Sequence, residues 1–130
     1  MHTALYLVLV LPILQAYPGF INLIPNGDKV TNPCSPGTVW FGVGHYNSSG
    51  SGPRNPFGED FAAAGHAWTQ DLCQKDSDGD GKTNGQELGD PQCTFIPNTG
   101  SPVSPPTGHP GICEPVGSAA CASQGFTCPT

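Results

Sequence analysis

The sequence predicts a small α+β domain that is rich in disulfides and loops. Six cysteines, 18 glycines and 15 prolines occur among 130 residues, and only 11% of the residues are charged. Glycine and proline interrupt regular structure, and a chain of this size buries a thin core, so disulfides must supply part of its stability. We expect one main helix followed by an acidic loop, short strands, and an irregular C-terminal tail rich in proline and glycine.

The first sixteen residues are typical of a secretory signal peptide. They read MHTALYLVLVLPILQA, an apolar run that ends in a small residue and is too short and too close to the start for a membrane span. No later segment is long and apolar enough to cross a membrane. We therefore expect a processed chain, residues 17–130, that is secreted and extracellular.

The regular elements follow from local sequence patterns. Residues 38–43, TVWFGV, are β-branched and aromatic and form the best strand candidate. Residues 59–75 are predicted to form the main helix. Apolar side chains recur within that segment at helical spacing, at Phe61, Ala64, Trp68 and Leu72. A single helical turn around residues 86–88 is expected to end at Gly89 and Pro91.

Residues 76–87, DSDGDGKTNGQE, match the EF-hand calcium loop at every position that the motif specifies. A calcium ion takes about six to eight oxygen ligands, and this loop supplies them from alternate positions. The expected ligands are Asp76, Asp78, Asp80, the Lys82 carbonyl, Asn84 (directly or through water) and a bidentate Glu87. A solvated acidic turn is the alternative interpretation. Because the chain has no second loop for pairing, we expect half an EF-hand that binds one structural calcium ion.

All six cysteines follow the predicted signal peptide. An even number in a small exported chain indicates a disulfide framework, whose connectivity the sequence alone does not resolve. Cys73 and Cys93 bracket the acidic loop, and a bond between them would stabilise the fold by about 3 kcal/mol in the chain-entropy description. Pairing of either residue with a cysteine of the tail remains the alternative.

Charge and motifs exclude several classes of function. The formal net charge is −6 and no cluster of lysine or arginine occurs, which argues against nucleic acid and anionic membranes as partners. No nucleophile elbow, phosphate-binding glycine loop or isolated catalytic cysteine is present, so we expect no enzyme. His45, His66 and His109 would form a copper or zinc site only if the fold gathered them. They lack metal-binding spacing, and ordinary surface or hydrogen-bonding roles are favoured.

Two further features concern aromatic residues and modification. Trp40 and Trp68 are expected in the core rather than in an exposed recognition patch. Asn47 begins the sequon Asn-Ser-Ser in a predicted surface loop, and is therefore a candidate for glycosylation, although unmodified sequons are also common.

Five segments together carry a resemblance to a known family. They read YPGFINLIPNG, GVGHYN, RNPFGEDFAAAGHAWTQDLC, DSDGDGKTNGQELGDPQC and GHPGICEP. With these strings the chain resembles the temptins, the secreted water-borne pheromone-complex proteins of gastropod molluscs. The resemblance divides the chain into a signal peptide at residues 1–16, a temptin-like domain at residues 17–115, and a cysteine-containing tail at residues 116–130.

The resemblance also implies disulfides and a function. It places one disulfide between Cys73 and Cys93 and a second between Cys34 and a tail cysteine such as Cys113, which leaves Cys121 to pair with Cys128. The implied function is that of an attractant acting with attractin-like peptides, or through a chemosensory receptor, in mating or spawning aggregation. Two other functions remain as alternatives: a calcium-binding matrix or egg-mass structural protein, and a copper-dependent secreted oxidoreductase that uses the three histidines.

Overall fold

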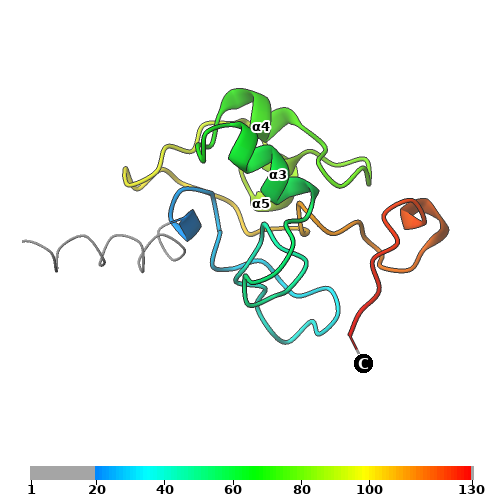
Figure 1. Ribbon diagram of the computed structural model, residues 1–130. Helices are drawn as coiled ribbons and strands as arrows, with labels where there is room; N and C mark the ends of the chain where they lie inside the picture. Colours follow the sequence, from blue (N-terminus) through cyan, green and yellow to red (C-terminus); the bar gives the residue numbers. More distant parts are fainter. Residues whose placement is uncertain (1–19, 130) are drawn as a thin grey trace, which may run out of the picture.

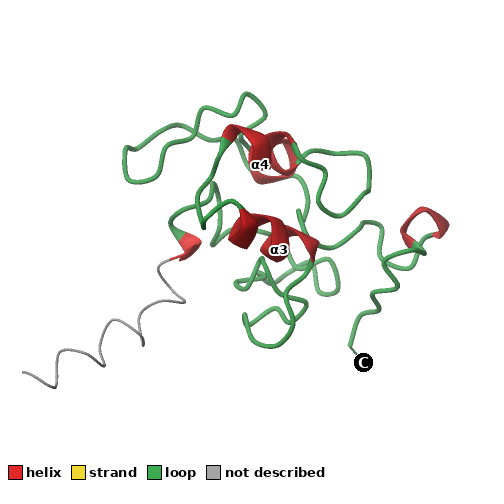
Figure 2. Cartoon of the chain, turned by 45° about the horizontal axis from the view of Figure 1, so that its top comes forward, coloured by secondary structure: helices red, strands yellow, loops and turns green. Residues whose placement is uncertain are grey.

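Short helices joined by long loops make up most of the fold. The computed structural model describes residues 20–129, so the predicted signal peptide at residues 1–16 lies outside the described part. The helices that lie wholly within this part are α3 (Pro56–Ala63), α4 (Gln70–Gln74), α5 (Asn84–Leu88) and the 3-10 helix η2 (Ala119–Cys121), and Phe20 and Ile21 are also helical (Figure 1 and Figure 2). None of the helices in residues 20–129 combines the length and apolar character needed to span a bilayer.

The bounds of α3 follow from its cap and its end. The Asn55 side chain accepts a hydrogen bond from the backbone N–H of Gly58 over 2.9 Å, which satisfies one of the free donors of the first turn. The helix ends at Ala63 because Gly65 and His66 both adopt left-handed backbone conformations, with φ of 75° and 57°. Left-handed residues interrupt α-helical hydrogen bonding and typically terminate a helix.

The prediction of one continuous helix over residues 59–75 is therefore wrong. The chain bends after α3 and starts again at α4, where the Thr69 hydroxyl caps the helix by accepting a hydrogen bond from the Leu72 N–H over 3.1 Å. The helical spacing of apolar residues is nevertheless meaningful, because Phe61 and Leu72 both lie in the same core. The spacing of apolar residues therefore predicts which side chains are buried, but it does not predict the break between α3 and α4.

Helix α5 has a start and an end that the local sequence encodes. Thr83 and Gln86 form a reciprocal capping box, in which the Thr83 hydroxyl accepts from the Gln86 N–H and the Gln86 side chain accepts from the Thr83 N–H. Gly89 ends the helix in the left-handed region at φ 85°. The helical turn predicted around residues 86–88 is confirmed, and it begins at Asn84.

The strand predicted at residues 38–43 does not form, and no strand occurs among residues 20–129. Pairing in this part is limited to isolated antiparallel bridges, Thr31 with Val39 and His45 with Arg54. The chain turns back directly after Trp40, whose indole Nε1 donates to the carbonyls of Gly42 at 3.0 Å and His45 at 3.2 Å. A turn so close to the bridge leaves too little extended backbone for a ladder.

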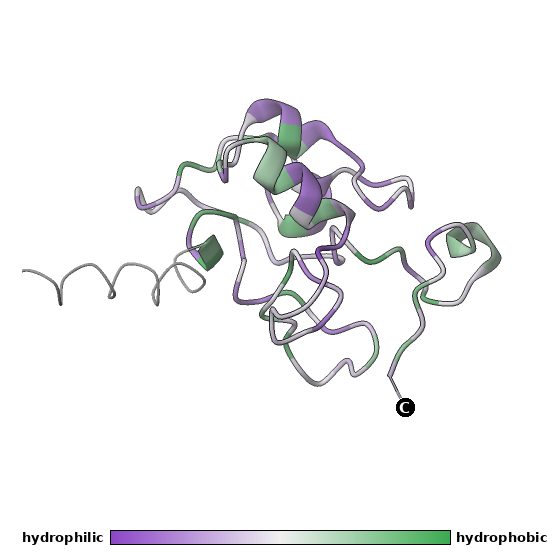
Figure 3. Cartoon of the chain, viewed as in Figure 1, coloured by the Kyte–Doolittle hydropathy of each residue, from purple (hydrophilic) through white to green (hydrophobic). Residues whose placement is uncertain are grey.

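A small hydrophobic core lies beneath the helices. Its buried members are Ile24, Val30, Val43, Phe57, Phe61, Leu72 and Leu88. Trp40 is 2% exposed, so the expectation that it belongs to the interior is confirmed. Trp68 is half-buried and packs against the cluster from its border, so for this residue the expectation is confirmed only in part. Figure 3 shows hydrophilic residues concentrated on α4 and the loop that follows it, outside this core.

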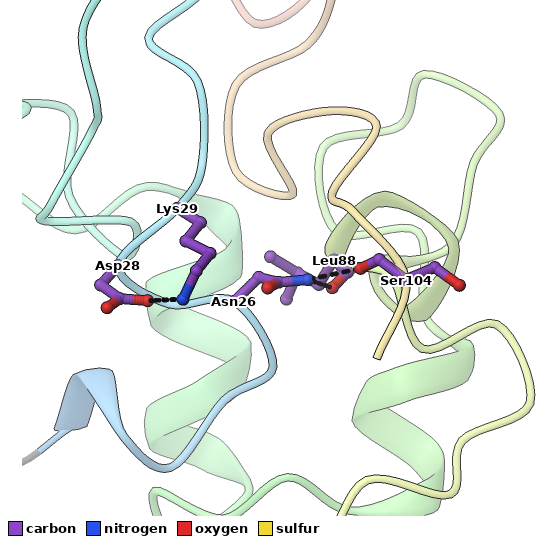
Figure 4. A network of polar contacts seen from close by, with 5 residues as sticks. All are labelled: Asn26, Asp28, Lys29, Leu88 and Ser104. Atoms are coloured by element: carbon purple, nitrogen blue, oxygen red, sulfur yellow. Dashed lines mark hydrogen bonds and ion pairs between the residues drawn. The ribbon is translucent and has the colours of Figure 1, made fainter. Parts of the chain in front are cut away.

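The N-terminal segment is attached to the helices through Asn26. Its side-chain Nδ2 donates to the carbonyl of Leu88, the last residue of α5, at 2.9 Å and to the carbonyl of Ser104 at 2.7 Å, as Figure 4 shows. The neighbouring ion pair between Lys29 and Asp28 is exposed and contributes little to stability. Asn26 therefore joins three segments that are distant in the sequence.

The disulfides partly differ from those that the resemblance implies. The bond between Cys73 and Cys93 is confirmed. The pairing of Cys34 with a tail cysteine is also confirmed, but its partner is Cys128 and not Cys113. The pairing of Cys121 with Cys128 is wrong, because the structure joins Cys113 to Cys121. The reason is a local fold in the tail: the Gln124 side chain accepts from the Cys113 N–H and donates to the Gly111 carbonyl. This brings Cys121 back to Cys113 and leaves Cys128 for Cys34.

The C-terminal segment is held at its end by aromatic packing as well as by a disulfide. The Phe126 ring stacks on Tyr46 with centroids 5.9 Å apart and meets the edge of Trp40 at 6.0 Å. In Figure 1 this orange and red segment forms a lobe at the edge of the molecule. The Cys34–Cys128 bond, with a sequence separation of 94, contributes about 4.7 kcal/mol in the chain-entropy description.

Candidate metal site

The acidic loop at residues 76–87 is held at both ends by short helices. Helix α4 precedes it, α5 contains its last residues from Asn84 to Glu87, and the two helices pack against each other. Asn84 is fully buried at the start of α5, and its Nδ2 donates to the Leu72 carbonyl and to the Ser77 hydroxyl, both at 2.8 Å. Together with the Cys73–Cys93 disulfide, these bonds hold the loop in a defined shape.

The loop gathers three aspartates. Carboxylate oxygens of Asp76, Asp78 and Asp80 all lie within 4.8 Å of one another. Each aspartate also accepts hydrogen bonds from loop amides: Asp76 from the N–H groups of Gly79 and Gly81 at 2.9 and 2.8 Å, Asp78 from that of Asp80 at 3.2 Å, and Asp80 from that of Lys82 at 3.1 Å. The backbone therefore orients the carboxylates toward one another despite their mutual repulsion.

Two carboxylate oxygens in this cluster are buried without a partner. Oδ2 of Asp78 and Oε1 of Glu87 receive no hydrogen bond, and their residues are only 8% and 1% exposed. Burial, followed by the charge of Asp80, raises the pKa of Asp78 to about 8. Burial, followed by the charges of Asp78 and Asp80, raises the pKa of Glu87 to about 10. A buried carboxylate without a counter-charge is strongly unfavourable, so the arrangement fits a cation.

Oxygen donors of this kind suit a hard divalent ion such as calcium. The structure brings together the predicted ligands Asp76, Asp78 and Asp80, with Glu87 close enough for their charges to act on its carboxyl. Asn84 differs, because both protons of its amide are used inside the protein and its Oδ1 has no partner. Its position favours a role in anchoring α5 to α4.

A cavity of about 760 Å³ opens beside the acidic loop, and Asp80, Lys82 and Glu87 line one side of it. The other side comes from distant segments, among them Gly108, Glu114 and the Cys34–Cys128 disulfide. Sequence reasoning gave Glu114 no role at the metal site, because it lies 27 positions after Glu87 in the printed sequence and belongs to no metal-binding motif. Only the fold brings it to the loop.

The three histidines do not form a metal site, so this alternative is wrong. Among residues 20–129, the group of potential ligands close enough to share an ion is the aspartate trio. The His66 ring stacks on Phe20 at 4.5 Å. His109 is fully buried, lies edge-on against Trp40 at 4.8 Å, and accepts a hydrogen bond from the Gly111 N–H at Nδ1. Burial lowers the pKa of His109 to about 3, so its ring is neutral.

A second cavity, of about 650 Å³, is lined mainly by apolar side chains. Phe20 and Phe41 line it and are 36% and 53% exposed, which is unusual for residues of this size. The core residues Phe57 and Phe61 and the ring of His66 also line it. We refer to this surface, defined by Phe20, Phe41 and His66, as the apolar groove.

Asn47, the candidate glycosylation residue, is exposed on a loop. Its Oδ1 accepts hydrogen bonds from the N–H of Ser49 at 2.9 Å and from the Ser49 hydroxyl at 2.7 Å. The asparagine and hydroxyl residues of the sequon are therefore in contact and accessible from solvent.

Comparisons with known proteins agree on one family. A family model described as Temptin C-terminal matches residues 14–112. The chain is 51% identical over 102 residues to temptin from Aplysia californica, an alignment that covers 78% of this chain and 82% of that protein. No solved structure matches the chain significantly. Since both the family model and the relative cover most of its length, the chain belongs to the temptin family.

Proposed function

We propose that this protein is a secreted, water-borne pheromone component whose fold is held by one structural calcium ion. The observation that carries the proposal is the 51% identity to Aplysia temptin. The protein would act in a complex with attractin-like peptides, or on a chemosensory receptor, to promote mating or spawning aggregation. It would work by being recognised, with no catalytic step of its own.

The calcium part of the proposal is supported by the unpartnered oxygens of Asp78 and Glu87. The ligands would be Asp76, Asp78, Asp80, the Lys82 carbonyl, Asn84 through water, and Glu87. An isolated loop of this kind in extracellular proteins binds calcium with a Kd of about 10⁻⁴ to 10⁻³ M, so the ion would stay bound in calcium-rich fluid. The ion would neutralise the buried carboxylates and so stabilise the fold.

We propose the apolar groove as the surface that contacts an attractin-like peptide. The support is the pair of exposed rings, Phe20 and Phe41, next to a cavity that would accept apolar side chains. Concave apolar surfaces that bury aromatic anchors supply most of the binding energy in peptide complexes.

The test uses purified protein and a synthetic attractin-like peptide, with binding measured by calorimetry. Phe41→Ser should weaken binding by about tenfold or more, since an aromatic anchor commonly contributes over 1 kcal/mol. Ile96→Ser is the matched control, because Ile96 is 60% exposed but does not line the groove. In a water-borne attraction assay, Phe41→Ser should likewise attract less than wild type, and Ile96→Ser should attract as wild type does. Absence of both peptide binding and attraction would contradict the proposal.

Self-association provides the contrast with a structural role in an egg mass. A matrix component should form larger species as calcium rises to millimolar concentrations, whereas the proposed pheromone component should not. Sedimentation of the protein across that range separates the two functions. Mass analysis of the protein from its native secretion would show in the same preparation whether Asn47 carries a glycan.

A further inference from the structure

The wall of the cavity opposite the acidic loop is attached directly to the last predicted ligand. The N–H groups of Thr107 and Gly108 donate to the backbone carbonyl of Glu87 at 2.8 and 3.3 Å, and the Thr107 hydroxyl donates to the carbonyl of Gln86 at 3.1 Å. Residues 107–108 therefore lie across α5 and are bonded to its backbone at Glu87, so that a shift of Glu87 would shift them as well.

Glu114 is held on this same wall. Its Oε1 accepts a hydrogen bond from the His109 N–H at 2.6 Å. The carboxylates of Glu114 and Glu87 flank Gly108: a Cβ atom at that glycine would lie 3.3 Å from Oε1 of Glu114 and 3.0 Å from Oε2 of Glu87. Both side chains also line the cavity with Asp80. A carboxylate from outside the loop therefore lies at the edge of the acidic cluster.

This position is electrostatically unfavourable without a cation. Burial, followed by the charge of Asp80, raises the pKa of Glu114, and only its hydrogen bond to His109 and the charge of Lys82 oppose the shift. Lys82 is also the basic residue that lines the cavity. The unpartnered oxygens of Glu87 and Asp78, more than nine-tenths buried, are independent evidence that this cluster faces a positive ligand.

The ion would have room for a further ligand. In a loop of this type the ninth position commonly acts through water. Here the Asn84 Nδ2 donates to Leu72 and Ser77, while its Oδ1 is buried without a hydrogen-bond partner. Glu114 is a carboxylate on the cavity wall beyond Glu87.

We propose that Glu114 is a further calcium ligand, so that the ion joins the C-terminal segment to the acidic loop. The inference rests on the calcium site of the proposed function and adds a residue that no loop motif contains. Glu114 also lies beyond residues 14–112, which the temptin family model matches. Calcium would therefore organise two parts of the chain at once, the loop at residues 76–87 and the C-terminal segment from Cys113 onward.

The test measures calcium binding by calorimetry and inner-sphere hydration by the luminescence lifetime of bound terbium. Glu114→Gln is the main variant, because glutamine keeps an oxygen that can accept from the His109 N–H and loses the charge. Expected results are calcium affinity about tenfold lower and about one additional terbium-bound water than in wild type. Glu59→Gln, at an exposed glutamate of α3, is the matched control and should bind like wild type.

The outcomes distinguish the two proposals. If Glu114→Gln binds calcium and terbium as wild type does while Glu87→Gln does not, Glu114 only caps the His109 N–H and the inference is overturned, whereas the loop site stands. If wild type binds no calcium, both fail. Hydrogen exchange gives a second measure: calcium should slow exchange of the amides at residues 109–121 in wild type and should protect only the loop region in Glu114→Gln. Protection confined to the loop in wild type would also overturn the inference.

Discussion

The indole of Trp68 donates a hydrogen bond to Oδ2 of Asp90 over 2.9 Å, which ties the bend between α3 and α4 to the turn after α5. Asp90 is only 3% exposed and accepts further hydrogen bonds from the N–H groups of Thr94 and Phe95. One buried carboxylate therefore organises the turn that contains Cys93. All of these hydrogen-bond donors belong to the protein.

Replacing Asp90 by alanine should destabilise the fold strongly. Each buried donor left without an acceptor costs about 1 to 3 kcal/mol, so we expect a loss of about 3 kcal/mol or more in the free energy of unfolding. Chemical denaturation measures it. Asp28→Ala removes an exposed aspartate whose partner Lys29 is also exposed, and should change stability by less than about 0.5 kcal/mol. Equal effects of the two variants would contradict the assigned role of Asp90.

Glu87→Gln should have opposite effects with and without calcium. Without calcium, the substitution replaces a buried carboxyl group, which has an unpartnered oxygen and a pKa raised to about 10, with a neutral amide, so the variant should be at least as stable as wild type. With calcium at about 100 times its Kd, wild type should gain about 2.7 kcal/mol that the variant lacks. Thermal melting of both proteins, once in calcium and once in a chelator, tests whether their order of stability reverses. A variant less stable than wild type in the chelator as well would point to a purely structural glutamate.

Asn55→Asp should destabilise more than the loss of a simple helix cap. The Asn55 Nδ2 donates to the carbonyls of Val43 at 2.8 Å and His45 at 3.0 Å, and aspartate would place a carboxylate oxygen against both. We expect a loss of about 3 kcal/mol or more. Thr69→Ala, which removes the cap of α4, should cost about 1 kcal/mol. Urea titration of both variants compares them, and equal losses would show that Asn55 acts only as a cap.

His109 should make stability fall at acidic pH. Burial lowers its pKa in the folded protein to about 3, against 6.5 when exposed, so between these values the unfolded chain takes up a proton that the folded chain does not. The contribution of His109 to stability should then decrease as pH falls from about 6.5 toward 3, by up to about 1.4 kcal/mol per pH unit. The raised pKa values of Asp78 and Glu87 act in the opposite direction, so the His109 contribution is measured as a difference from a variant.

The variant His109→Asn isolates this contribution. Asparagine keeps an acceptor for the Gly111 N–H but does not titrate, so the difference in unfolding free energy between wild type and variant should narrow as pH falls from 6.5 to 4. The cavity left beneath Trp40 lowers the variant's stability by a constant amount and does not affect the slope. A pH-independent difference would show that His109 titrates normally in the folded protein.

Local sequence signals predicted what is local in the structure. The start and the end of α5 are encoded locally, by the capping box of Thr83 and Gln86 and by the terminating Gly89. The disulfide between Cys73 and Cys93 is suggested by their positions on either side of the acidic loop. The break after α3 was missed because Gly65 is tolerated within helices, and the left-handed conformation of His66 has no signature in the sequence.

Contacts between distant segments lie beyond such signals. The acidic motif picks out three aspartates that the fold brings together, yet Glu114 reaches their neighbourhood only because residues 107–108 cross α5. The pairing of Cys34 with Cys128 likewise depends on the fold-back of the tail around Gln124. Neither relationship has a fixed spacing, so no pattern in the sequence could specify it.

The Cys34–Cys128 bond makes most of the chain a covalent ring. A protease that cuts once at an exposed position inside that ring, for example at Ile96, opens a loop but releases no fragment. The two new ends remain attached through the disulfide, and Cys73–Cys93 encloses a smaller ring within the larger one. A molecule closed in this way can be nicked once and still diffuse as a single particle.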